Sequence, residues 1–225
     1  MSSLWERFPP VSLLALLLLC LMAATATATA SAPPSWDPNQ QPLLKGYGFP
    51  RGTPNAPVWL ELHGDLLCID TLEDWDNVIS PLLAHYKEHQ VYFIFHPFPL
   101  PYHYNAFFAA KAGNAVEALQ PGKYLDWVEA VFDEQNSFLK PAANKTEPEV
   151  IQMFADLAQR RFSIPNDKFY QQFNLDATEM TTRAQWKFSA ARGVSGTPTY
   201  FVNGVRVLSG NWSTQDWINA IDSLL

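Results

Sequence analysis

The chain has 225 residues, of which 48% are apolar and 16% are charged, a composition typical of a folded globular protein and not of a disordered one. Fifteen basic residues against 22 acidic ones give a net charge of −7. This charge argues against nucleic acid as a partner, because contacts to phosphates need a concentrated basic surface.

The N-terminus predicts an export signal. Arg7 precedes an apolar run over Val11–Met22, which is shorter than the ~20 apolar residues that cross a bilayer. The next segment, Ala23–Ala32, contains only Ala, Thr and Ser, as is usual before a cleavage site. We expect residues 1–30 to be removed as a signal peptide, which leaves no membrane span in the mature chain; a retained anchor is the alternative. The protein is then expected in the secretory pathway, most simply secreted, with the vacuole and the lumen of the endoplasmic reticulum left open.

The start of the mature chain lacks regular periodicity. Residues 31–57 are rich in Pro, Gly, Asn and Gln and are predicted to form an extended arm. A short strand is expected next, at Val58–His63. Apolar residues at helical spacing then predict a helix over Thr71–Lys87, kinked at Pro81. A fully apolar second strand is expected at Val91–Phe95.

A block of helices is predicted in the middle of the chain, separated by prolines and glycines. The expected ranges are Tyr104–Leu119, Tyr124–Phe138, Glu147–Phe162, Asn166–Phe173 and Ala177–Arg192. The last of these is expected to stop at Gly193, because glycine is the common residue just after a helix.

The C-terminal part predicts a hairpin and one more helix. Two short strands, Thr199–Val202 and Val205–Leu208, flank Asn203-Gly204, which is the strongest short signal of a hairpin. A final helix is expected over Ser213–Leu225, capped by Ser213 or Thr214. The first two strands should pair in parallel, and the hairpin should add antiparallel strands to the same sheet.

Two local segments resemble one known family. Leu62–Thr71 (LHGDLLCIDT) is similar to the strand, acidic turn and Cys-x-x-Cys that opens the first helix of the thioredoxin fold. Gly193–Gly204 (GVSGTPTYFVNG) resembles that family's segment with a cis-proline beside the active cysteine. With the helical block, this pattern is similar to the DsbA-like branch of the thioredoxin superfamily. The resemblance covers residues 58–225. It implies an α/β, thioredoxin-like fold with a helical insertion, at about residues 103–173, between a βαβ half and a ββα half.

The resemblance implies that the active cysteine is Cys68 and that the cis-proline is Pro198. Thr71 stands where the family has its second cysteine. The chain's other cysteine, Cys20, lies in the predicted signal peptide. We therefore expect a Cys-x-x-Thr site with one thiol, which cannot close a disulfide within the mature chain.

The resemblance also suggests roles around the cysteine. Cys68 is expected to be exposed at the start of a helix, where the helix dipole favours a thiolate. Thr71 is expected to donate its hydroxyl to that thiolate. Thr197 and Ile69 are expected to contact a substrate strand that lies beside Pro198. The alternative is a buried, inert cysteine that remains after loss of a redox role.

Other polar residues near the cysteine are candidates for a supporting role. Glu61 on the first strand is a candidate proton relay, since a buried acid there would have a raised pKa; facing solvent is the alternative. Asp65 and Asp70 flank the cysteine and should oppose a thiolate, although Asp70 also suits an ordinary first helical turn. His63 and His96 end the first two strands and are candidate activators, but no acid is placed in the sequence to orient them.

No metal is expected. His63, Cys68, His96 and His103 carry ligand atoms, yet the sequence has no short spacing of the kind found in zinc sites. No glycine-rich nucleotide motif is present either, so no cofactor is expected apart from glutathione as a co-substrate.

The leading function is thiol–disulfide exchange by a monothiol route on protein or peptide thiols, or on glutathione mixed disulfides. A non-catalytic binding or chaperone module that kept the fold is the main alternative, and a glutathione-dependent transferase or isomerase is the third. Glycosylation sequons at Asn144 and Asn211 agree with export.

We expect the exported protein to start near Ser31 and to lack Cys20. N-terminal sequencing of the protein recovered from the secretory pathway checks this. Recovery of an exported chain that still carries Met1 would contradict it.

Overall fold

The computed structural model describes residues 47–139, 142, 144–209 and 212–225. The predicted signal peptide, most of the predicted arm and Asn211 therefore lie outside the described residues. Within these ranges, no helix is both long enough and apolar enough to span a membrane.

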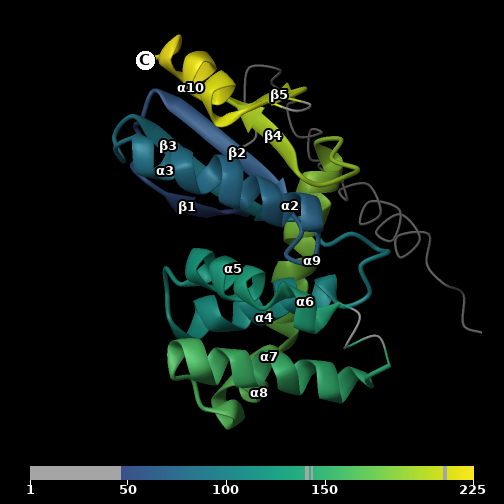
Figure 1. Cartoon of the computed structure of the whole chain (residues 1–225). Helices are drawn as coiled ribbons and strands as arrows, with labels where there is room; N and C mark the ends of the chain where they lie inside the picture. The colour runs from purple at the N-terminus through teal and green to yellow at the C-terminus, as the bar shows by residue number, and fades with distance from the viewer. Residues whose placement is uncertain (1–46, 140–141, 143, 210–211) are drawn as a thin grey trace, which may run out of the picture. The chain divides into compact units, whose positions relative to one another are not determined.

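A five-stranded sheet forms the centre of the domain, in the order β1-β3-β2-β4-β5 (Figure 1). The strands are β1 (Phe49–Arg51), β2 (Val58–Gly64), β3 (Val91–Pro97), β4 (Thr199–Val202) and β5 (Val205–Val207). β2 and β3 are parallel, and all other neighbouring pairs are antiparallel. The predicted parallel start and antiparallel hairpin are thus confirmed.

The edge strand β1 lies near the end of the predicted extended arm, which the sequence did not predict to join the sheet. It pairs antiparallel with β3, with Phe49 opposite Phe95. The sequence did not predict this strand because it contains Pro50, and proline is unfavourable in most strands. An edge strand tolerates a proline, because a residue on its outer side need not donate a hydrogen bond to the sheet. The Phe49 ring stacks on Tyr124 with centroids 3.4 Å apart, which ties the edge strand to the helical block.

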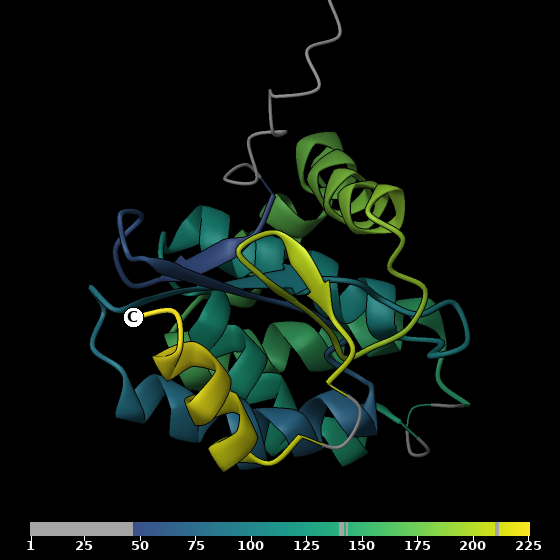
Figure 2. The ribbon, with the colours of Figure 1, turned by 90° about the horizontal axis from the view of Figure 1, so that it is seen from above.

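Helices cover both faces of the sheet. Figure 2 shows α9 (Asp176–Ala191) on one side, with α2 (Ile69–Asp74), α3 (Ser80–His85) and α10 (Thr214–Asp222) on the other. The remaining helices are α4 (Ala106–Leu119), α5 (Tyr124–Asp133), α6 (Gln135–Phe138), α7 (Glu147–Phe162) and α8 (Asn166–Phe173). They form the predicted helical insertion between the two halves of the sheet.

One helix of that block differs from the prediction. The single helix expected over Tyr124–Phe138 is broken at Glu134, which separates α5 from α6. The break turns Gln135 toward the end of β2, where its side-chain amide donates to the Leu66 carbonyl at 2.9 Å. Such a long-range contact leaves no periodic signal in the sequence.

The kink expected at Pro81 takes the form of a π-helical turn, η2 (Trp75–Ile79), between α2 and α3. Proline has no N–H, so Pro81 cannot donate to the Asn77 carbonyl four residues earlier. The Thr214 hydroxyl donates to that carbonyl instead, at 2.5 Å. This hydrogen bond attaches the start of α10 to the irregular turn.

Local end signals are confirmed. Asn203 and Gly204 both have positive φ, as the predicted hairpin turn requires, and Gly193 ends α9 with a φ of +80°. Ser213 caps α10 through a reciprocal pair of hydrogen bonds with Asp216.

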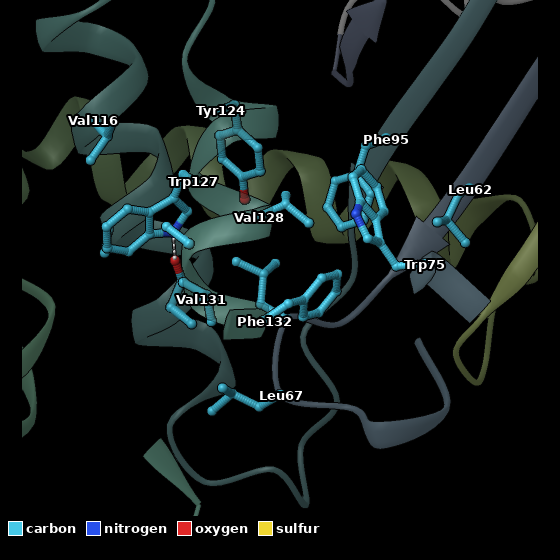
Figure 3. Close-up of a cluster of buried hydrophobic side chains, with 14 of the residues drawn as sticks. Leu62, Leu67, Trp75, Phe95, Val116, Tyr124, Trp127, Val128, Val131 and Phe132 are labelled. Carbon is cyan, nitrogen blue, oxygen red and sulfur yellow. Dashed lines mark hydrogen bonds between the residues drawn. The ribbon is translucent and has the colours of Figure 1, made fainter. Parts of the chain in front are cut away.

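Sheet and helical block share one hydrophobic core. Leu62 and Phe95 point from the strands toward Trp75 and the α5 side chains Tyr124 and Phe132 (Figure 3). The Trp75 ring lies 6.0 Å from the Phe95 ring and 5.8 Å from the Phe132 ring. Burial of these large aromatic side chains holds the insertion against the sheet.

A glycine inside α4 tests this core. A Cβ at Gly113 would lie 2.6 Å from Trp127 Cδ1 and 2.6 Å from Tyr124 Cε2, and both of these rings are buried. Alanine gains about 1 kcal/mol of helix propensity over glycine, but overpacking costs about 1–3 kcal/mol. The difference between these two terms leads us to expect Gly113→Ala to lower the free energy of unfolding by up to about 2 kcal/mol in urea titrations.

The matched control is Gly196→Ala, where an added Cβ meets no atom within 4 Å among the described residues. We expect this variant to change the free energy of unfolding by much less. Equal losses in both variants would contradict the packing explanation.

Candidate active site

Cys68 lies at the junction of β2 and the first helix. It is the N-cap residue of α2, and its N–H donates to the Asp65 carbonyl at 3.1 Å. The Leu67 N–H donates to the Asp65 carboxylate at 2.8 Å, so the turn before the cysteine is held by backbone and side chain together. The predicted position at the start of a helix is confirmed.

The thiol points toward the loop that precedes β4. Its Sγ donates to the Thr197 carbonyl at 3.5 Å, and the Thr197–Pro198 bond is cis. Thr199, the first residue of β4, pairs with His63 near the end of β2, which explains why two segments so distant in sequence meet here. The predicted meeting of Cys68 with the cis-proline is confirmed.

The expectation that Cys68 is exposed is wrong. The residue is 4% exposed, because its thiol lies against the Thr197 segment and its neighbours Leu66 and Leu67 are buried. Ile69, the next residue, is 50% exposed and places an apolar side chain at the surface beside the cysteine. A partner can therefore contact Ile69 directly, whereas the thiol must turn outward to react.

Thr71 does not support the thiol in the expected way. Its hydroxyl is buried and has no hydrogen-bond partner among the residues that the structure describes. Its methyl group lies against the central sheet, since a Cβ added at Gly64 would come within 2.8 Å of Thr71 Cγ2. The predicted hydrogen bond from Thr71 to the sulfur is therefore not formed.

A cleft opens beside Pro198. It has a volume of about 530 Å³ and lies between the acidic side of α2 and the β4–β5 hairpin. Asp70 and Asp74 line one wall, and Arg206 lines the other. Burial raises the pKa of Asp74, although a hydrogen bond from Tyr200 at 2.8 Å acts in the opposite direction.

A buried polar network lies on the α9 face of the sheet. His63 and His96 occupy paired positions on β2 and β3, and their rings stack 4.5 Å apart. Glu61 accepts from His96 Nε2 at 3.0 Å and from Arg192 at both carboxylate oxygens, at 2.5 and 3.0 Å. His63 Nδ1 shares a hydrogen bond of 2.7 Å with the Ser189 hydroxyl. The expectation that no acid orients these histidines is thus wrong for His96, which Glu61 binds, whereas His63 is held by Ser189.

The charges of this network follow from burial and pairing. Burial alone would raise the pKa of Glu61, but hydrogen bonds from His96 and Arg192 and the charge of Arg192 lower it overall. Burial lowers the pKa of His63 to about 2, and the charges of His96 and Arg192 act in the same direction. Burial also lowers the pKa of His96. The raised pKa expected for Glu61 is therefore wrong, and its role as a relay stays a prediction.

The same cluster contains ligand-type atoms. Each of Glu61, His63 and His96 offers one such atom, and these three atoms lie within 4.8 Å of one another. The Arg192 guanidinium already binds Glu61 at both oxygens and lies 3.5 Å from His63 Nε2. A metal ion would have to displace this fixed positive charge, so the expectation of no metal is retained as a prediction.

Three groups around the site have roles that the sequence did not predict. Asp65 is buried and also accepts from the Leu100 N–H at 2.9 Å and from His103 at 2.7 Å. Gln135 donates to the Cys68 carbonyl at 3.1 Å from the helical block. Arg192 lies in the last turn of a predicted helix, where a basic residue is ordinary. Of the three, only Asp65 was noticed in the sequence, as an acid beside the cysteine. Its role as a hydrogen-bond acceptor was not predicted.

Comparison with known proteins is informative at the level of family and fold. The family described as Thioredoxin matches residues 45–223. A search of curated proteins found no match.

Several solved structures are similar. The alpha-DsbA1 protein of Wolbachia pipientis has a TM-score of 0.65 and 22% identity, over 82% of this chain and 93% of that one. A putative protein-disulfide isomerase from Pseudomonas syringae has a TM-score of 0.63 and 18% identity, over 77% and 97%. Oxidised BdbD from Bacillus subtilis has a TM-score of 0.62 and 19% identity, over 79% and 92%. At such identities the likeness establishes the fold alone.

The buried histidines predict an acid-sensitive fold. Both have a folded-state pKa below the usual 6.5, so their contribution to stability is present above that pH and is lost as the pH falls. We expect the free energy of unfolding to fall by up to about 1.4 kcal/mol per pH unit for each histidine that must stay neutral. Urea titrations between about pH 7.5 and about pH 5 measure this slope, above the range where carboxylates titrate.

We expect His63→Gln to reduce the slope of the free energy of unfolding against pH by about the contribution of one proton, whatever effect the substitution has on stability at neutral pH. His89→Gln is the control, because His89 is exposed. An unchanged slope in His63→Gln would show that this histidine does not carry the pH dependence.

Proposed function

Because the chain belongs to the thioredoxin family and has a DsbA-like fold, we propose that it performs thiol–disulfide exchange on protein or peptide thiols through Cys68 alone. One observation carries the proposal. The Cys68 thiol lies at the start of α2 and 3.5 Å from the Thr197 carbonyl, directly before cis-Pro198. A sulfur in that place is next to a backbone segment along which a substrate strand can lie.

The proposed reaction has two steps. The Cys68 thiolate attacks one sulfur of a substrate disulfide, so that a Cys68–substrate disulfide forms and the other substrate sulfur leaves as a thiolate. A second thiol, such as glutathione, then attacks the substrate sulfur of this mixed disulfide. Cys68 leaves as a thiolate, and the new disulfide joins the substrate to glutathione. Each step exchanges one sulfur–sulfur bond for another, so no further oxidant is required.

The need for an external thiol follows from the cysteine count. The whole sequence has two cysteines, and Cys20 lies in the proposed signal peptide. Thr71 takes the place of a resolving cysteine and has no sulfur to attack the mixed disulfide. We infer that the cycle stops at this stage until a second thiol arrives.

Substrate access in this proposal requires a small movement. The Cys68 side chain must turn from the Thr197 carbonyl toward the cleft beside Pro198, where a substrate disulfide would lie. The exposed Ile69 side chain offers an apolar contact at the entrance. Thr197 contributes backbone and not its hydroxyl, which is buried.

A second candidate function is a non-catalytic binding module. The observation that favours it is the 4% exposure of Cys68, which is typical of a structural cysteine. In that case the cleft beside Pro198 would hold a partner segment without exchanging sulfur bonds.

Export belongs to the proposal as well. The proposed signal peptide would carry the chain into an oxidising compartment, where disulfide substrates are abundant. Asn144 is exposed just ahead of α7, as a glycosylated asparagine must be. Its modification stays a prediction.

Incubation with oxidised glutathione tests the thiol directly. We expect one glutathione to attach to the mature protein at Cys68, as seen by mass spectrometry, because the attack needs only one thiolate. Turnover of a peptide disulfide should depend on added glutathione, and Cys68→Ser should abolish both signals. If wild type forms no adduct and its thiol resists alkylation in the folded state, the binding module is the better explanation.

Thr71→Cys gives a complementary test. The two side chains have similar volumes, so the variant should fold and place a second thiol one helical turn from Cys68. We expect it to exchange disulfides without glutathione. Thr71→Ser is the control, because it changes the packing but adds no sulfur, and it should keep the dependence on glutathione.

A further inference from the structure

A second pocket lies away from the cleft at Pro198. It has a volume of about 280 Å³ and is formed by the segment after β3, the start of α4 and one face of α9. Leu100, Phe107 and Trp186 make its walls apolar. This volume lies just below the range of about 300–1,000 Å³ that is typical of pockets for complete small-molecule ligands.

The walls of this pocket are held in place by contacts behind them. Trp186 stacks on Phe98, with centroids 5.5 Å apart and planes 5° from parallel. The Asp65 carboxylate accepts from the Leu100 N–H and from His103, which fixes the segment after β3. Because the shape is preformed, an entering side chain would have little ordering to induce.

The rim of the pocket is positive in a chain whose net charge is −7. Arg183 and Lys187 follow one another at helical spacing on α9, and both line the pocket. Arg183 pairs with Glu179, but the same carboxylate also pairs with Lys111. Lys187 forms no ion pair with any residue in the described part of the chain. Glu179 is thus shared between two cations, and Lys187 adds a positive charge to the rim that no acid in the described ranges balances.

Exposed aromatic and apolar side chains lie along the chain beside the pocket. Tyr104 at its edge is 77% exposed, and Tyr102 just before it is 71% exposed. Met180, one turn before Arg183 on α9, is 59% exposed. Tyrosine, tryptophan and arginine are the residues that dominate binding at protein interfaces. A small molecule confined to the pocket would leave these side chains uncovered, whereas a protein segment can cover them.

We propose that this pocket is a docking site for a segment of a partner protein that inserts one aromatic side chain and carries carboxylates beside it. The apolar walls take the ring, and Arg183 and Lys187 face the acidic neighbours. The inference goes beyond thiol exchange and holds whether or not Cys68 reacts.

The position of the pocket gives docking a consequence for the cysteine. Asp65 holds the pocket wall at Leu100 and also holds the Leu67 N–H, immediately before Cys68. The pocket wall and the cysteine turn are therefore fixed by the same buried carboxylate. Docking there would bring the partner close to Cys68 without occupying the cleft beside Pro198.

Three capped pentapeptides test the proposal against the full mature protein, here as Cys68→Ser so that no sulfur exchange interferes. The first has a central phenylalanine between two aspartates, the second replaces the aspartates by asparagines, and the third replaces the phenylalanine by alanine. NMR titration follows the backbone amides of α9 and the Trp186 indole. We expect the first peptide to shift these signals, the second to bind about three- to tenfold more weakly, and the third not to bind.

The variant Arg183→Gln/Lys187→Gln should remove the difference between the first two peptides. The control is Arg160→Gln/Lys168→Gln, which removes the same charge from exposed positions on α7 and α8. Equal binding of the charged and uncharged peptides to the unsubstituted rim would overturn the proposal. An equal loss in the control variant, or shifts confined to another surface, would overturn it as well.

Discussion

The buried Asp65 carboxylate is the interaction on which the arrangement around Cys68 depends. A carboxylate removed from water costs several kcal/mol unless it is fully hydrogen-bonded. Here it accepts from Leu67, Leu100 and His103, which belong to the cysteine turn, the segment after β3 and the approach to α4. The hydrogen bond with Asp65 raises the pKa of His103, since a carboxylate beside the imidazole favours its protonated form. Three segments are thus held at one end of the sheet by a single side chain.

Polar groups on the other face of β2 play a similar part. A central strand covered on both faces must bury whatever it carries, and Glu61 and His63 are satisfied by residues near the end of α9. The Glu61–Arg192 pair and the His63–Ser189 hydrogen bond hold that helix end against the sheet. The chain passes from there directly into the loop that contains Thr197, so this network positions the backbone that contacts Cys68.

The cysteine lies at the start of α2 beside the cis Thr197–Pro198 bond, and two features of its surroundings bear on its reactivity. Its sulfur is turned inward to a backbone carbonyl, and its neighbour one turn along the helix is Thr71, whose hydroxyl has no partner in the described ranges. Both features are compatible with a thiol that reacts once and waits for another thiol. Both features also fit a non-catalytic binding module, so the reactivity of Cys68 decides between the two proposed functions.

Local features were determined by the sequence. The ranges of α7 and α8, the Asn203-Gly204 turn and the cap at Ser213 follow from spacing, backbone freedom and side-chain to backbone bonds within a few residues. The family resemblance added the meeting of Cys68 with Pro198.

Four features were determined only by the tertiary structure. They are the pairing of β1 with the sheet, the break between α5 and α6, the burial of Cys68, and the partners of Glu61 and Asp65. Glu61 and Arg192 are 131 residues apart, and Cys68 and Thr197 are 129 residues apart. No periodicity records such contacts, because they exist only after the sheet has brought the two ends of the domain together.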